Sequence, residues 1–175
     1  ALSLGCSRFL FSGSQAEYGI RDTLMSETDI CRPVSEYGKA KAEFYRQACE
    51  YLAGQSGFPQ TEPPIDYVHT RIFSVYGPGD HPWSLVETCR KTFLAGGLME
   101  LGECTQQWNF LHRDDCVRAL YKLLEAPGRI GLKGTENGIY NIAAAEEETR
   151  PLREYVEEMY RLCGERGNCL YGKRP

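Results

Sequence analysis

Residues 33–43 read PVSEYGKAKAE and place Tyr37 four positions before Lys41. Pro33 and Ser35 are typical of a helix start, and four residues make about one helical turn, so both side chains project from one face. A free phenol has a pKa near 10, so a tyrosine that acts as a base near neutral pH needs positive charge beside it. The spacing indicates proton transfer in a redox reaction, and Tyr-x-x-x-Lys is also a pattern that arises by chance.

The segments on either side of this helix predict a parallel α/β unit. The apolar run Arg8–Phe11 predicts a buried strand that delivers small polar residues, Ser12–Ser14, at its carboxyl end. Apolar residues at helical spacing continue the helix to Gly54, residues 55–64 predict a loop, and residues 65–75 predict a second buried strand. Strand, helix, loop and strand in this order predict a parallel crossover.

The second half of the chain continues the alternation of strands and helices. Pro82 predicts the start of a helix, and Asp114 and Asp115 lie where a helix cap belongs. The apolar stripe of that later helix consists of Val117, Leu120, Tyr121 and Leu124. The remaining predictions are short strands or extended segments at 98–101, 106–112 and 139–143 and an amphipathic helix at 151–163. The pattern predicts one α/β unit.

Composition excludes several classes of protein. The chain has 175 residues, 42% of them hydrophobic and 25% charged, which is ordinary for a globular protein with one core. A net charge of -4 without a basic run before the last residues argues against nucleic acid as a partner. No apolar stretch approaches the roughly 20 residues that span a bilayer, so we expect no membrane partner and a cytoplasmic location. The eight cysteines are scattered without Cys-x-x-Cys, which predicts free thiols and no metal site.

Five motifs in this order resemble the extended short-chain dehydrogenase/reductase superfamily, specifically its NAD-dependent epimerase/dehydratase family, which acts on nucleotide sugars. The motifs are FSGS at 11–14 with Tyr18-Gly19, YGKAK at 37–41, RIFSVYGPGD at 71–80, QWNFLH at 107–112 with Asp115, and YNI at 140–142. The resemblance implies an α/β fold, with the C-terminal half of a Rossmann-type parallel sheet and its catalytic helix in residues 1–75. Residues 76–175 would form mostly a small α/β substrate-binding lobe.

The resemblance also implies roles for particular residues. Ser14, Tyr37 and Lys41 correspond to the catalytic trio, in which the tyrosine exchanges a proton with a sugar hydroxyl while a hydride passes to a nicotinamide. The lysine would hold the cofactor ribose and lower the phenol pKa, and the serine would hydrogen-bond the sugar oxygen. Contacts with NAD or NADP are implied for Ser12, Tyr37, Lys41, Phe73, Ser74 and Val75. Contacts with a nucleotide-diphosphate sugar are implied for Ser14, Gln15, Ser74, Tyr76 and Trp108.

Three departures from the family pattern narrow these expectations. Gln15 and Ala16 stand where sugar dehydratases carry an Asp-Glu pair, and neither can transfer a proton, so dehydration is disfavoured. Trp108 stands where many relatives have an arginine against the diphosphate, so the phosphate partner is open and Trp108 is either a stacking residue or a buried strand aromatic. Ser74 replaces an asparagine that often touches the sugar.

The sequence contains no glycine-rich Gly-x-x-Gly-x-x-Gly turn between a strand and a helix, the element that holds a dinucleotide pyrophosphate. We therefore expect an internal piece of a longer enzyme that lacks the first half of its Rossmann sheet and is inactive by itself. The leading hypothesis is a nucleotide-sugar epimerase or 4-keto-sugar reductase. The alternatives are a non-catalytic binding or regulatory module of the same fold and an oxidoreductase for a non-sugar substrate. The helix of Tyr37 and Lys41 is the expected face of a homodimer.

Overall fold

The computed structural model describes residues 2–21, 23–56, 65–132 and 137–174. The chain forms two compact units, each made of two separate segments. Residues 1–75 and 114–143 form the first unit, and residues 76–113 and 144–175 form the second. The chain thus leaves the first unit after Val75 and returns to it at Asp114. The functional division at residue 75, into a Rossmann half and a substrate lobe, stays a prediction.

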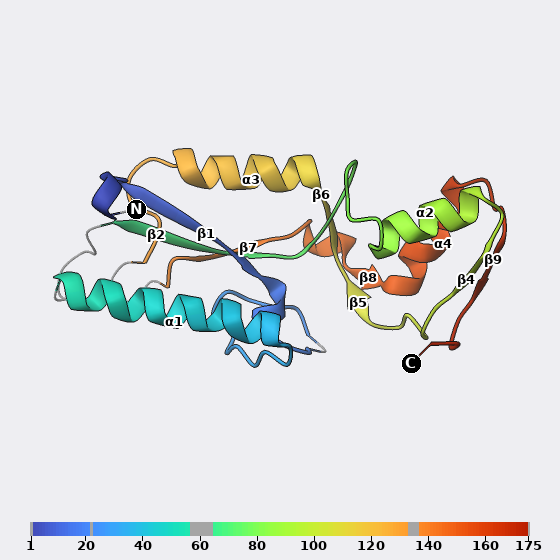
Figure 1. The fold of residues 1–175 in the computed structure, drawn as a ribbon, viewed down its shortest axis with the longest axis horizontal. Coiled ribbons are helices and arrows are strands. Elements are labelled where there is room, and N and C mark those ends of the chain that lie inside the picture. The colour runs from blue at the N-terminus through green and yellow to red at the C-terminus, as the bar shows by residue number, and fades with distance from the viewer. Residues whose placement is uncertain (1, 22, 57–64, 133–136, 175) are drawn as a thin grey trace. The chain divides into compact units, whose positions relative to one another are not determined.

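A three-stranded parallel sheet forms the centre of the first unit (Figure 1). Its strands are, in spatial order, β1 (Arg8–Ser14), β2 (Asp66–Ile72) and β7 (Ile139–Ile142). The register sets Arg8 beside Asp66 at the amino end of the first two strands and Ser14 beside Ile72 at the carboxyl end. The predicted strands and their parallel pairing are confirmed. The predicted second strand at 65–75 is interrupted at Phe73, after which β3 (Ser74–Tyr76) begins.

Helices α1 (Glu36–Ser56) and α3 (Arg113–Glu125) lie on opposite faces of this sheet (Figure 1). The α1 helix begins where the sequence predicts it, and Ser35 Oγ accepts the Gly38 N–H at 3.1 Å. The apolar stripe predicted on α3 is largely exposed, since Val117, Tyr121 and Leu124 are 62%, 58% and 50% exposed. Helical spacing identifies an apolar face but not what covers it, and the described residues leave this face open. Of the predicted 55–64 loop, residues 57–64 lie outside the described residues, and residues 55 and 56 still belong to α1.

The second unit packs two helices against short strands. Its elements are α2 (Leu85–Leu94), β4 (Leu98–Glu100), β5 (Gln107–Trp108), β6 (Phe110–His112), β8 (Arg150–Pro151), α4 (Leu152–Leu162) and β9 (Asn168–Leu170). Strands β4 and β9 pair in parallel, and β5 and β8 pair antiparallel. Helix α2 starts at Leu85 and not at Pro82, where the sequence predicts it, because Ser84 Oγ caps the helix by accepting the Glu87 N–H at 3.2 Å. A shared apolar core includes Phe93 and Val156.

Two further predictions from composition bear on the fold. All eight cysteines are free, as their scattered spacing predicts, and Cys89 and Cys104 are buried in the apolar core of the second unit. Among the residues that the structure describes, no helix is both long and apolar enough to cross a membrane.

The short 3-10 helices are η1 (Leu2–Leu4), η2 (Gln15–Glu17) and η3 (Glu146–Glu148).

Candidate active site

Ser14 ends β1 and caps the short helix η2 that follows it. The Ala16 N–H donates to Ser14 Oγ at 3.2 Å, and the Ser14 N–H donates to Glu17 Oε1 at 2.9 Å. A hydroxyl has two acceptor lone pairs and one hydrogen, so a Ser14 oxygen that accepts from Ala16 still has its own O–H to donate. The half-buried Ser14 side chain can therefore offer a hydrogen bond to the oxygen of a bound molecule.

Tyr37 and Lys41 lie on one face of α1, as their spacing predicts. The Lys41 ammonium donates to the Ser12 carbonyl at 2.7 Å and lies 5.5 Å from the centre of the Tyr37 ring. The Tyr37 side chain is 58% exposed, so a substrate oxygen can reach its hydroxyl. An ammonium has three N–H groups, and one bond to Ser12 leaves others for a ligand. The pair thus provides an accessible phenol beside a fixed positive charge.

Gly38 allows α1 to approach η2 closely. A Cβ atom at this position would lie 2.3 Å from the Ala16 carbonyl oxygen, much closer than side-chain atoms approach backbone in folded proteins. Only glycine therefore permits this contact. Lys41 holds the Ser12 carbonyl and Gly38 lies against Ala16, so the two contacts bracket Ser14. The structure in this way brings Ser12, Ser14, Tyr37 and Lys41 together at the carboxyl end of β1.

A buried ionic network lies behind Ser14. Both carboxylate oxygens of Glu17 lie 3.0–3.1 Å from His69 Nε2, and Arg71 Nε donates to Glu17 Oε2 at 3.0 Å. Tyr67 OH lies 2.9 Å from His69 Nδ1, which extends the network further into the sheet. Burial alone would raise the pKa of Glu17. The hydrogen bond and charge of His69, the Ser14 N–H and Arg71 outweigh burial and hold the Glu17 pKa below its ordinary value.

The remaining predicted site residues fall into two groups. Phe73, Ser74 and Val75 directly follow β2 and are half-buried, as is Gln15, the first residue of η2. Tyr76 and Trp108 belong to the second unit. There the Phe110 ring lies 6.1 Å from the Tyr76 ring and 6.3 Å from the Trp108 ring, centre to centre. Trp108 packs against the apolar core, and its indole N–H is buried without a partner among the described residues.

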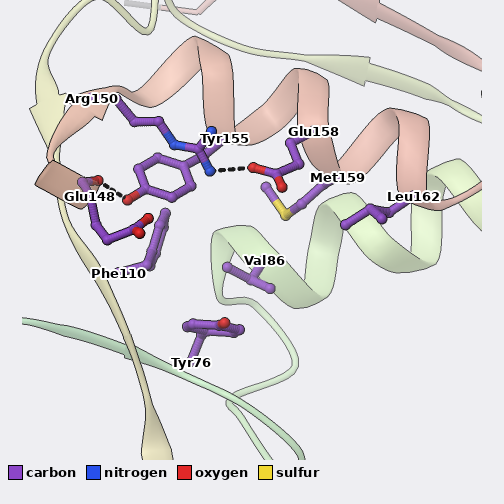
Figure 2. A pocket seen from close by; sticks show the side chains of 9 residues that line it. All are labelled: Tyr76, Val86, Phe110, Glu148, Arg150, Tyr155, Glu158, Met159 and Leu162. Carbon is purple, nitrogen blue, oxygen red and sulfur yellow. Dashed lines mark hydrogen bonds and ion pairs between the residues drawn. The ribbon is translucent and has the colours of Figure 1, made fainter. Parts of the chain in front are cut away.

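Tyr76 and Phe110 line a cavity of about 280 Å³ inside the second unit (Figure 2). Arg150 carries its guanidinium 4.0 Å from the centre of the Tyr155 ring and forms an ion pair with Glu158. The Arg150 Nε–H is buried without a partner among the described residues. Aromatic rings with a stacked guanidinium can hold a flat or ring-shaped ligand by stacking and directed hydrogen bonds.

The sequence alone does not indicate Glu17, His69, Arg71 or Arg150 as site residues. Charged and imidazole side chains in a strand or turn give no sign of burial, because their partners come from distant parts of the sequence. The available signal was Glu17, three residues after Ser14, which has the spacing of a capping box.

The chain is similar to one family of known proteins in sequence and in structure. The profile of the "NAD dependent epimerase/dehydratase family" matches residues 1–143. Among solved structures, MoeE5 in complex with UDP-glucose and NAD is 28% identical, with a TM-score of 0.77 over 98% of this chain and 53% of its own. A UDP-glucuronic acid 4-epimerase from Bacillus cereus is 23% identical, with a TM-score of 0.77 over 95% and 48%.

A UDP-glucose 4-epimerase from Thermotoga maritima, solved with UDP-glucose, is 23% identical and has a TM-score of 0.78 over 99% of this chain and 53% of its own. The chain thus spans about half the length of the structures it matches. The two matches at 23% identity show the fold alone. Together with the parallel sheet and its flanking helices, they confirm the predicted Rossmann-type α/β class.

Proposed function

The chain belongs to the NAD dependent epimerase/dehydratase family, and on this basis we propose that its protein is a nucleotide-sugar epimerase or 4-keto-sugar reductase with Tyr37 as general acid/base. The observation that carries the proposal is the arrangement at the end of β1. There the exposed phenol of Tyr37 lies beside the Lys41 ammonium. The same ammonium donates a hydrogen bond to the Ser12 carbonyl, in the strand that ends at Ser14.

The residues present fit the ribose and nicotinamide side of a dinucleotide. Among the described residues Lys41 donates a hydrogen bond to the Ser12 carbonyl, and its other N–H groups can donate to ribose hydroxyls. NAD or NADP bound there would supply the acceptance and return of a hydride. A glycine-rich turn for the pyrophosphate does not occur in residues 1–175, so we propose that another part of the complete protein contributes it.

The chemistry of this chain's own residues is proton transfer at a sugar oxygen. Tyr37 removes the proton from the sugar hydroxyl as the carbon is oxidised and returns it when the carbonyl is reduced. The Lys41 ammonium stabilises the negative charge that develops on the phenol oxygen. The Ser14 hydroxyl donates to the same sugar oxygen, a role that fits its free hydrogen.

We propose that the substrate is a nucleotide-diphosphate sugar. Ser14, Gln15 and Ser74 would contact the sugar. The matched MoeE5 structure contains UDP-glucose and NAD, which supports this class of ligand and cofactor. We propose Tyr76 and Trp108 as contacts of the remainder of the substrate, and the cavity that Tyr76 lines supports the assignment of Tyr76. Gln15 and Ala16 cannot act as acid and base, so epimerisation or reduction is favoured over loss of water.

Two further features belong to the same proposal. We propose a homodimer through α1, because Phe44 is an aromatic side chain that is 39% exposed on that helix. We also propose a cytoplasmic location, because nicotinamide cofactors and nucleotide sugars are both present in the cytoplasm.

Turnover by the complete protein tests the proposal. We expect NAD and a UDP-hexose to give an epimer, or a 4-keto sugar to be reduced, with proton NMR of the sugar as the readout. Residues 1–175 alone are expected to bind NAD weakly, and micromolar binding in calorimetry would contradict that part. A complete protein that turns over only a non-sugar alcohol, or nothing, would contradict the proposal and favour a different oxidoreductase or a non-catalytic module.

A further inference from the structure

The Glu17 side chain is fully buried, and its carboxylate is held by hydrogen bonds. Its carboxylate accepts from His69 and Arg71, which come from β2, and from the backbone N–H of Ser14 on β1. An ionised carboxylate removed from water is stable only when charge and hydrogen bonds replace its hydration. The Ser14 N–H is the one of these donors that belongs to a proposed catalytic residue.

Gly13 provides the space that this network occupies. A Cβ atom at residue 13 would lie 2.4 Å from Glu17 Oε1, 2.5 Å from the Thr70 carbonyl oxygen and 2.6 Å from His69 Nε2. The carboxylate therefore lies directly beside the backbone of the strand end. A rigid partner in this position fixes the direction in which the strand delivers its next residue, Ser14.

We propose that Glu17 is a positioning residue of the active site, whose carboxylate holds Ser14 by its backbone N–H so that the Ser14 hydroxyl is directed at the reacting sugar oxygen. This inference rests on the proposed function. Lys41 holds the Ser12 carbonyl, so the strand end is fixed on both sides of Gly13. We assign Glu17 no part in proton transfer, because its side chain is fully buried and its carboxylate is held by His69, Arg71 and the Ser14 N–H.

Asp66 offers a matched control. Its carboxylate is 97% buried, pairs with Arg8 at 2.7 Å and accepts the Gly131 N–H at 2.7 Å, at the opposite end of the same two strands. Asp66→Asn therefore removes a buried carboxylate of the same kind that holds no proposed catalytic residue. Its effect measures what general loss of a buried ion pair does to turnover.

The test compares Glu17→Gln, Glu17→Asp and Asp66→Asn in the complete protein. The readouts are kcat and KM for the nucleotide sugar and the hydrogen-exchange rate of the Ser14 amide by NMR. An amide has one acceptor oxygen, whereas Ser14 and Arg71 donate to different oxygens of the Glu17 carboxylate, so glutamine cannot accept both bonds. We expect Glu17→Gln to lower kcat by about tenfold or more and to speed hydrogen exchange of the Ser14 amide by a similar factor, with KM less affected. Asp66→Asn should leave kcat of the folded protein within about twofold of the original.

If Glu17→Gln does not fold, Glu17→Asp decides by the same criteria, because it keeps the charge beside Arg71 but is too short to hold the Ser14 amide. Unchanged kcat and Ser14 exchange in the folded variant would overturn the inference, as would an equal loss of kcat in Asp66→Asn. If the original protein turns over no nucleotide sugar, the proposed function fails separately. In that case the hydrogen-exchange rate of the Ser14 amide alone decides: faster exchange in the Glu17 variants supports the positioning role, and unchanged exchange contradicts it.

Discussion

The two ends of the β1–β2 pair are built from the same chemical parts. At the amino end, Asp66 forms a buried ion pair with Arg8, and at the carboxyl end Glu17 forms one with Arg71. In both pairs burial opposes ionisation, but hydrogen bonds and the nearby positive charge hold the carboxylate pKa below its ordinary value. The residue types and the carboxylate pKa shifts of the two ion pairs are therefore alike at both ends of the strands.

The ends differ in the backbone that each pair holds. Asp66 accepts from Gly131 N and Ile130 N, and Arg8 donates to the Leu123 and Leu124 carbonyls at the end of α3. That end ties a helix terminus and a loop to the sheet and satisfies their backbone groups. Glu17 instead holds Ser14. A buried ion pair thus anchors a helix end and a loop at the amino end, and at the carboxyl end it holds Ser14, the residue for which we propose a catalytic role.

We expect removal of the Glu17 carboxylate to lower the free energy of unfolding more than removal of the Asp66 carboxylate. Glu17→Gln leaves Arg71, which is 3% exposed, without its counter-charge, so we expect a loss of about 3–5 kcal/mol in the free energy of unfolding. Asp66→Asn should cost less, about 1.5–3 kcal/mol, because Arg8 keeps its bonds to the α3 carbonyls. Urea denaturation of the complete protein measures both. A larger loss for Asp66→Asn would show that the amino end carries more of the stability.

A substitution at Gly13 tests the packing at the carboxyl end, and we expect a smaller loss of stability from it than from Glu17→Gln. Gly13→Ala places a methyl group into the carboxylate and imidazole of the network, so we expect a loss of about 1–3 kcal/mol. Gly54→Ala is the control, because its Cβ meets nothing within 4 Å in α1, and alanine should stabilise the helix by about 0.5–1 kcal/mol. The same urea titrations give both values. Equal stability of the two variants would contradict the tight packing at Gly13.

Local sequence patterns predicted the elements that frame the site. The apolar run at Arg8–Phe11 and the small residues after it define β1, and the start signals at Pro33 and Ser35 define α1, because both depend on neighbouring residues. Their parallel pairing followed from the order of elements. The Tyr37–Lys41 contact followed from helical geometry alone.

The features that the sequence did not predict depend on distant residues. His69 and Arg71 lie in a strand that is buried along nearly its whole length, and their partner Glu17 is more than 50 residues away. The α3 stripe shows the same limit, since periodicity identified its apolar residues but not their exposure. The start of α2 was misplaced because a proline and the capping serine, Ser84, lie two residues apart.

Hydride transfer in Tyr37→Phe tests most directly whether the carboxyl end of β1 is the reactive end. Tyr51→Phe is the matched control, since Tyr51 lies on the same helix and is 57% exposed against 58% for Tyr37. In single-turnover reduction of the nicotinamide by a nucleotide sugar in the complete protein, we predict a loss of about 10²–10⁴-fold for Tyr37→Phe. Tyr51→Phe should react at the original rate. A Tyr37→Phe variant that reacts as fast as Tyr51→Phe would contradict the assignment of Tyr37 as acid and base.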